Sequence, residues 1–152
     1  MGNEELQEQI FARVPEATFE EGLSFLEITI PSEKCHSLMR TLRDQDVFAF
    51  DYLFCLTGVD WPETLSVVYH LKSTIHEHSL VVKAMISSRE HPKIDTVCDI
   101  WRTAEFHERE VYDLLGVVFT NHPDLRRIFL DDDWEGWPLR KDYVDEINIV
   151  EL

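Results

Sequence analysis

Residues 51–87 decide the fold, and they contain three apolar runs: DYLFCLT (51–57), TLSVVYHL (64–71) and HSLVVKAMIS (78–87). These runs are rich in the β-branched and aromatic residues that are typical of strands. The connections between them are short, whereas a crossover between parallel strands needs about a dozen residues or more. The sequence therefore predicts three consecutive antiparallel strands.

Two helices and one strand are expected before these runs. Acidic residues and an apolar stripe predict a helix over 4–14, with Asn3 as its cap. Alternation of apolar and polar residues predicts a strand over 23–30. Ser32 is expected to cap a second helix. The side of that helix that faces the core has the i, i+3, i+4, i+7 spacing and consists of Cys35, Leu38, Met39 and Leu42.

Helical segments are also expected after the strands. Apolar residues from Ile94 to Leu115 predict one or two helices, and Gly116 is a typical helix end. Together these elements predict an α+β domain over residues 1–116, in which helices pack on a mostly antiparallel sheet.

The last segment, residues 117–152, has neither a helical nor a strand period. Trp134 and Trp137 argue against plain disorder, because large aromatic residues are enriched in interfaces. We therefore expect this segment, hereafter the arm, to be functional or to wrap on a partner. Because residues from about 121 to 152 have no apolar face and no period, we expect them to be largely mobile in the isolated chain and ordered in an assembly with a partner.

Composition limits the functions open to the chain. Its 152 residues fit one compact domain. Thirty acidic residues against fourteen basic ones give a net charge of −16, which disfavours binding to nucleic acid and direct docking on anionic membranes. No apolar run approaches the roughly 20 residues of a membrane-spanning helix. The acidic start predicts neither a secretory signal nor a lipid anchor.

Few residues have the spacing of a metal or redox centre. Cys35, Cys55 and Cys98 form no C-x-x-C pair, so we expect reduced cysteines and no zinc or iron–sulfur cluster held by this chain. His76 and His78 could chelate a metal, although a solvated turn is the preferred interpretation.

The densest polar cluster spans residues 107–113, HEREVYD. It begins like a zinc protease motif, but Val111 stands where the second histidine is required. Glu110 and Asp113 lie one helical turn apart and could act as a catalytic carboxylate pair or bind a hard cation. The preferred interpretation is a solvated helix face on which Arg109 pairs with Glu105 or Asp113.

Three blocks of the sequence carry a resemblance to a known family. They are EREVYDLLG (108–116), HPDLRRI (122–128) and DWEGWPLRKDY (133–143), and LTGVD (56–60) extends the likeness more weakly toward the N-terminus. In order and spacing they resemble the signature of the C subunit of NADH:quinone oxidoreductase, the 30 kDa subunit family of respiratory complex I. Many members of that family continue the third block with proline, where this chain has Val144.

The resemblance implies an α+β domain over residues 1–116 followed by an extended C-terminal arm over residues 117–152 that wraps on a partner subunit. It also implies a non-redox subunit in the hydrophilic part of a proton-translocating complex. Such a chain packs against the D subunit and its neighbours near the quinone end, while FMN, iron–sulfur clusters and quinone belong to other subunits. It implies peripheral attachment on the cytoplasmic side of the membrane through the complex, as a stand-alone chain that is not fused to the D subunit. The alternatives are an equivalent subunit of a membrane-bound hydrogenase or ferredoxin-type dehydrogenase and, less favoured, an independent carboxylate-based hydrolase.

The resemblance implies no catalytic residue in this chain and a set of signature or interface residues instead. These are Glu108, Arg109, Glu110, Asp113, His122, Arg126, Arg127, Trp134, Trp137, Arg140 and Lys141. Carboxylates on the apolar side of the expected helix need partners. The basic residues of the arm could supply them within the chain or could bind the D subunit, and the sequence leaves both possibilities open.

Overall fold

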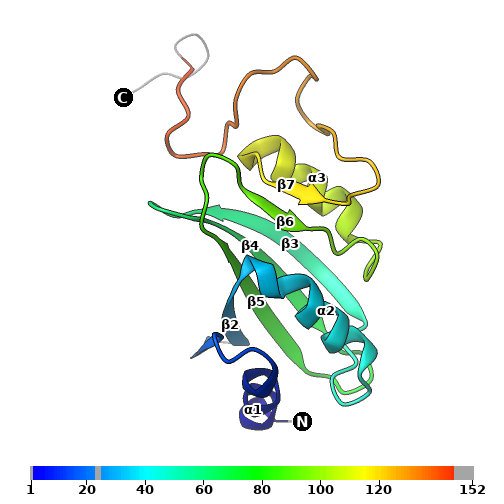
Figure 1. Cartoon of the computed structure of the whole chain (residues 1–152). Helices are drawn as coiled ribbons and strands as arrows, with labels where there is room; N and C mark the ends of the chain where they lie inside the picture. The colour runs from blue at the N-terminus through cyan, green and yellow to red at the C-terminus, as the bar shows by residue number, and fades with distance from the viewer. Residues whose placement is uncertain (1, 23–24, 146–152) are drawn as a thin grey trace.

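The computed structural model describes residues 2–22 and 25–145, which form one α+β domain followed by the arm (Figure 1). A five-stranded sheet has the order β1-β2-β5-β4-β3. Its strands are β1 (Thr18–Glu21), β2 (Leu26–Pro31), β3 (Tyr52–Asp60), β4 (Leu65–Lys72) and β5 (Ser79–Ile86). The expected α+β class with a mostly antiparallel sheet is confirmed.

The three strands of residues 51–87 lie close to their predicted positions. Strands β3, β4 and β5 pair antiparallel in chain order, as the short connections required. Strand β2 joins β5 in parallel, since the intervening helix carries the chain across. The strand expected over 23–30 begins at Leu26, and residues 23 and 24 lie outside the described part. The short edge strand β1, which pairs with β2, was not predicted.

The helices are α1 (Asn3–Arg13), α2 (Cys35–Asp44) and α3 (Ala104–Leu115). Both predicted N-caps are wrong. Gly2 precedes α1 and Asn3 is already helical. Ser32 opens a short 3-10 turn, η1 (Ser32–Lys34), and no side chain caps α2. The extended backbone of Pro31 leads into that turn, so the α-helix begins at Cys35, two residues later than a cap at Ser32 implied.

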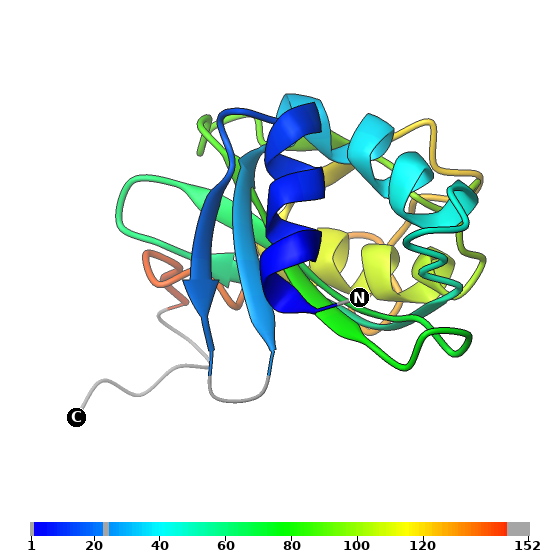
Figure 2. The same cartoon turned by 90° about the horizontal axis from the view of Figure 1, so that it is seen from below.

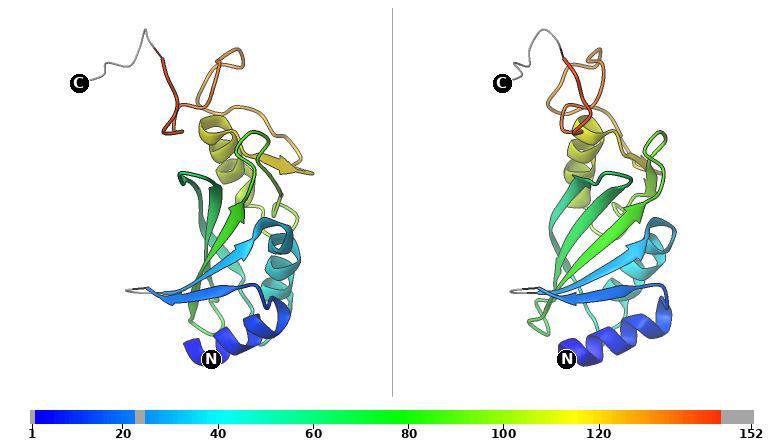
Figure 3. Two further views of the ribbon diagram at one scale, coloured as in Figure 1. Left: turned by 60° about the vertical axis from the view of Figure 1, so that its left-hand side comes forward. Right: turned by 90° about the vertical axis from the view of Figure 1, so that its left-hand side faces the viewer.

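The core lies on one face of the sheet. All three helices pack on that face, and no described helix covers the other (Figures 2 and 3). The predicted stripe of α2 is buried, and α1 contributes Leu6 and Ile10. Gly58 of β3 lets α3 approach the sheet closely, because a Cβ there would lie 2.4 Å from Leu115 Cδ1. The apolar period of the sequence thus sets which side of each element is buried.

Only part of the segment from Ile94 to Leu115 is helical. Ile94 belongs to β6 (Lys93–Asp95), and α3 begins at Ala104. As predicted, α3 ends at Gly116, whose φ of 78° is in the left-handed region. The first residues of the arm then form β7 (Val118–Thr120), which pairs in parallel with β6. The division into residues 1–116 and 117–152 remains a prediction, and this pairing ties the two parts together.

Candidate functional site

The signature residues meet where the arm crosses α3. Glu108, Arg109 and Asp113 are at most 6% exposed, whereas Glu110 points to solvent. The expected solvated face, with Arg109 paired to Glu105 or Asp113, is therefore wrong for the buried residues. Apolar neighbours such as Val111 carry them into the interior, and buried charges need partners. Those partners come from the arm and from the segment before α3.

Asp113 anchors the arm through backbone hydrogen bonds. Its Oδ2 accepts the N–H groups of Ile128 (3.1 Å), Phe129 (2.7 Å) and Leu130 (3.1 Å). Its Oδ1 lies 3.0 Å from Arg127 Nη1. Burial alone would raise the pKa of Asp113, but these donors outweigh it and hold that pKa below its ordinary value. Asp113 is therefore an ionised buried anchor with its oxygens occupied.

The side chain of Arg127 makes hydrogen bonds both to α3 and to carbonyls further along the arm. Its Nη1 also donates to Asp113 O (2.7 Å), and its Nη2 donates to Trp134 O and Gly136 O (2.9 Å each). Its guanidinium carbon lies 4.5 Å from the centre of the Trp137 ring. Residues 127–136 are hereafter called the arm loop. The planar guanidinium of Arg127, at the start of this loop, thus connects α3 with the carbonyls near the end of the loop.

Arg109 contributes a second connection between α3 and the arm. Its Nε donates to Arg126 O (3.2 Å) and its Nη2 to Arg127 O (3.1 Å). It pairs with no carboxylate among the described residues. Its two donors therefore tie the carbonyls of residues 126 and 127 to α3.

Glu108 fixes the segment before α3. Its Oε2 accepts from Thr96 Oγ1 (2.5 Å) and from Cys98 Sγ (3.3 Å), and its Oε1 accepts from Val97 N (2.8 Å). Burial raises the pKa of Glu108, although these three donors hold it down. Burial also raises the pKa of the Cys98 thiol to about 12, so this cysteine remains protonated at neutral pH.

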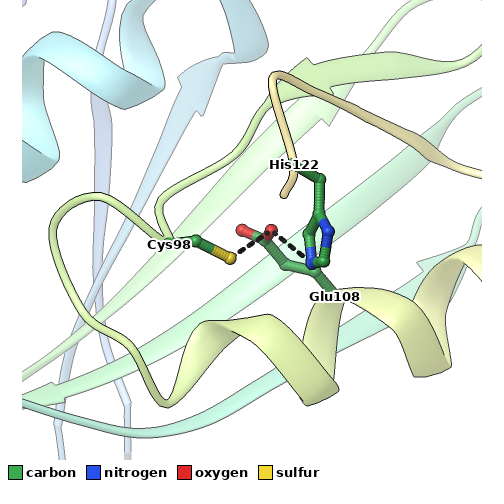
Figure 4. A group of neighbouring side chains, drawn as sticks. All are labelled: Cys98, Glu108 and His122. Carbon is green, nitrogen blue, oxygen red and sulfur yellow. Dashed lines mark hydrogen bonds and ion pairs between the residues drawn. The ribbon is translucent and has the colours of Figure 1, made fainter. Parts of the chain in front are cut away.

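His122 brings the arm to this cluster (Figure 4). Its side chain is fully buried, and its Nε2 lies 3.8 Å from Glu108 Oε2. Candidate ligand atoms of Cys98, Glu108 and His122 all lie within 4.8 Å of one another, which is the spacing of a possible metal site.

The hydrogen bonds of His122 argue against a metal at this place. The Asp124 N–H donates to Nδ1 at 3.0 Å, so Nδ1 carries no proton. The neutral ring then carries its proton on Nε2, which donates to Glu105 O at 3.0 Å. A metal at Nε2 would displace that proton and would require one on Nδ1, where the N–H of Asp124 already points. The triad fits a closed hydrogen-bond cluster better than a metal site.

The other candidate metal pair is engaged in a similar way. His76 Nε2 lies 2.6 Å from Asp46 O and His78 Nε2 lies 2.9 Å from Phe48 O. Because carbonyl oxygens only accept hydrogen bonds, each Nε2 carries a proton. The preferred interpretation of these residues as part of a turn agrees with this arrangement, although His78 is half-buried.

A second anchor joins the arm to β3. The Lys141 N–H donates to Asp60 Oδ2 (2.8 Å), and Arg89 donates to Asp60 Oδ1. The Arg89 guanidinium and the Lys141 N–H hold the pKa of the buried Asp60 low. Arg140 donates to Leu115 O (2.7 Å) and to Arg89 O (3.1 Å).

The structure corrects the expected roles of the basic residues. Among the basic arm residues Arg126, Arg127, Arg140 and Lys141, only Arg127 pairs with a carboxylate of α3. Arg140 binds carbonyls, Lys141 contributes its backbone, and the side chain of Arg126 pairs with Asp124 at the surface. The sequence left open whether the carboxylates of the helix pair within the chain or with another subunit. Asp113 pairs within the chain, with Arg127.

The two tryptophans also pack within the chain. The Trp137 ring lies 5.4 Å from that of Tyr112 and covers Gly116, where a Cβ would lie 2.6 Å from the indole. Trp134 is half-buried and gives its carbonyl to Arg127.

Sequence reasoning missed Thr96 and Arg89, which have no motif. Asp60 could have been found, since it ends the weakly matching block LTGVD at the end of a predicted strand, and a carboxylate that is buried there needs a partner.

The described residues of the site make structural contacts between α3, the arm and β3. Glu110 is exposed while Asp113 is buried, so they do not form the carboxylate pair that a hydrolase would need. No helix in the described part of the chain is long and apolar enough to cross a membrane. The fold and site therefore define an α+β domain that holds a C-terminal arm through buried charges.

Comparisons with known proteins identify this class. A family described as "Respiratory-chain NADH dehydrogenase, 30 Kd subunit" matches residues 28–147, and the chain belongs to this family. It is 51% identical over 126 residues to the C/D subunit of NADH-quinone oxidoreductase from Phocaeicola vulgatus, covering 82% of this chain and 24% of that one. It is 41% identical to the C subunit of NADH-quinone oxidoreductase from Chlorobium phaeobacteroides, covering 81% and 75%. The resemblance seen in the sequence is confirmed.

A solved structure agrees with the fold. A chain from the membrane-bound sulfane sulfur reductase, an archaeal respiratory membrane complex, superposes with a TM-score of 0.78 at 30% identity, covering 95% of this chain and 86% of that one. The chain spans about a quarter of the Phocaeicola relative and 43% of the C subunit from Chloroherpeton thalassium, which is 50% identical over 104 residues.

Proposed function

We propose that this chain is a non-redox subunit of a proton-translocating NADH:quinone oxidoreductase and that it packs against a D-type subunit in the hydrophilic part of the complex. The observation that carries the proposal is the 51% identity to a protein that is named as both the C and the D subunit. In a single polypeptide the C and D subunits stay together covalently. A separate C subunit must associate with the D subunit through a noncovalent interface.

The site supports a scaffolding role. The buried charges near α3 bind backbone groups of the arm, and the exposed Glu110 and the buried Asp113 do not form a catalytic carboxylate pair. In this proposal FMN, the iron–sulfur clusters and quinone are bound by other subunits. The chain lies on the cytoplasmic side and reaches the membrane only through the complex.

A second function has support from the solved structure. The likeness to a chain of a sulfane sulfur reductase fits an equivalent role in a related complex, such as a membrane-bound hydrogenase or a ferredoxin-type dehydrogenase. The same domain would then serve a complex with a different electron donor.

Purification of the tagged chain from membranes of the cells that encode it tests both proposals. We expect a D-type subunit and flavin- and iron–sulfur-containing chains to co-purify, with NADH-dependent quinone reduction. Activity with hydrogen or reduced ferredoxin in place of NADH would favour the second function. Recovery of the chain alone from gently solubilised membranes would contradict both.

A further inference from the structure

The arm loop is held at both ends before any partner binds. Arg127 lies at its start and donates to carbonyls of Trp134 and Gly136 near its end. Trp134 N also donates to Asp131 O (3.0 Å), which makes a turn inside the loop. The loop projects beyond α3, at the end of the molecule opposite α1 (Figures 1 and 3). It is therefore a closed and protruding element.

Phe129 is the exposed apolar side chain of this loop. Its N–H makes the 2.7 Å hydrogen bond to Asp113, and both neighbouring N–H groups bind the same carboxylate oxygen. Its side chain nevertheless remains in solvent, and the residue is 66% exposed. A fixed backbone that presents a large aromatic ring loses little conformational entropy when the ring is buried in a partner.

A negatively charged stretch begins two residues after Phe129. Asp131, Asp132 and Asp133 are consecutive and all exposed. An aromatic anchor beside carboxylates is complementary to an apolar pocket with lysine or arginine at its rim. A second copy of this chain, with a net charge of −16, matches this requirement poorly.

We propose that the arm loop is the docking element for the D-type subunit, with Phe129 inserted into an apolar pocket and the three aspartates facing basic residues at its rim. This inference rests on the proposed function and adds the contacting residues. We choose the D-type subunit as the partner because a relative is named as a C/D subunit, in which both subunits share one polypeptide.

Substitution of Phe129 in the assembled complex tests the inference. The variant Phe129→Ala should reduce the amount of D-type subunit that co-purifies per tagged chain by about tenfold or more, as expected for a central aromatic anchor. The thermal midpoint of the purified chain should stay unchanged because the ring is mostly exposed. Phe11→Ala is the matched control. Phe11 is 51% exposed on α1, and its loss should not affect the yield.

The aspartates provide a second measurement. The triple variant Asp131→Asn, Asp132→Asn, Asp133→Asn should reduce co-purification severalfold at low salt, with little effect at high salt, because screening already weakens those contacts. Equal loss at all salt concentrations, or no loss, would contradict a basic rim.

A photo-reactive phenylalanine analogue at position 129 identifies the occupant. A cross-link to the D-type subunit supports the inference, whereas a cross-link to a second copy of this chain, to another subunit or to nothing overturns it. Failure of the proposed function is distinguishable, since then the wild-type chain would also lack a D-type partner. If the wild type and Phe129→Ala retain the D-type subunit equally, the docking role of the arm loop is wrong while the proposed function stands.

Discussion

The sheet domain and the arm are held by different forces. In the domain, apolar side chains such as Tyr69, Phe48 and Phe50 are fully buried. In the arm, no residue between 120 and 145 is buried as a whole, yet α3 binds it through Asp113, a carboxylate with no exposed surface. Apolar burial is non-directional and tolerant of substitution, whereas a buried carboxylate with several donors depends on each partner. Single substitutions should therefore separate the two regions.

The largest expected effect is that of Asp113→Ala. It leaves Arg127 buried without its counter-charge and three backbone N–H groups without an acceptor, which costs about 3–5 kcal/mol. Native-state amide hydrogen exchange measures this loss. The amides of Ile128, Phe129 and Leu130 should lose most of their protection.

The exchange of the sheet amides shows whether the two regions are separate. Amides of β4 should keep their protection in Asp113→Ala, and Glu110→Ala, an exposed change on the same helix, should affect neither region. If β4 lost protection together with the arm, the arm and the sheet would be one cooperative unit and the contrast would be wrong.

The same contrast explains what the sequence could predict. The strands of residues 51–87 and the buried stripe of α2 follow periods that the sequence displays, so both are predictable. The arm lacks such a period, and its contacts are single side chains that bind backbone groups over long sequence separations, such as Asp60 with the N–H of Lys141. Periodicity carries no information about such pairs. The family blocks marked their residues without indicating their partners.

Arg109→Ala should have an intermediate effect. Its guanidinium is buried and gives two hydrogen bonds to arm carbonyls, but it neutralises no carboxylate among the described residues. Loss of the two donors should lower the free energy of unfolding by about 1–3 kcal/mol, as measured with urea. Arg109→Lys retains the charge and should restore only part of the loss. Full rescue by lysine would show that charge, and not the two directed hydrogen bonds, fixes the arm.

Glu108→Gln should change the pH dependence more than the stability at one pH. Because burial raises the folded pKa of Glu108 above its ordinary 4.5, its contribution is fully present below that value and is lost as the pH rises through the folded pKa. The free energy of unfolding of the wild type minus that of the variant should therefore fall as the pH rises above 4.5 and through the raised folded pKa of Glu108. A flat difference would mean that the donors from Thr96, Val97 and Cys98 cancel the effect of burial.

The smallest effect should come from Arg126, although it stands beside Arg127 in the same family block. The side chain of Arg127 is 8% exposed and pairs with Asp113, whereas that of Arg126 is 65% exposed and pairs with Asp124. Exposed pairs contribute about 0–1 kcal/mol, so Arg126→Ala should barely change urea unfolding, while Arg127→Ala should release the arm. Equal destabilisation by both variants would indicate that the arm is held by general attraction to an acidic domain. If Arg126→Ala leaves stability unchanged but lowers recovery of the D-type subunit, the side chain of Arg126 contributes to the interface and not to the fold.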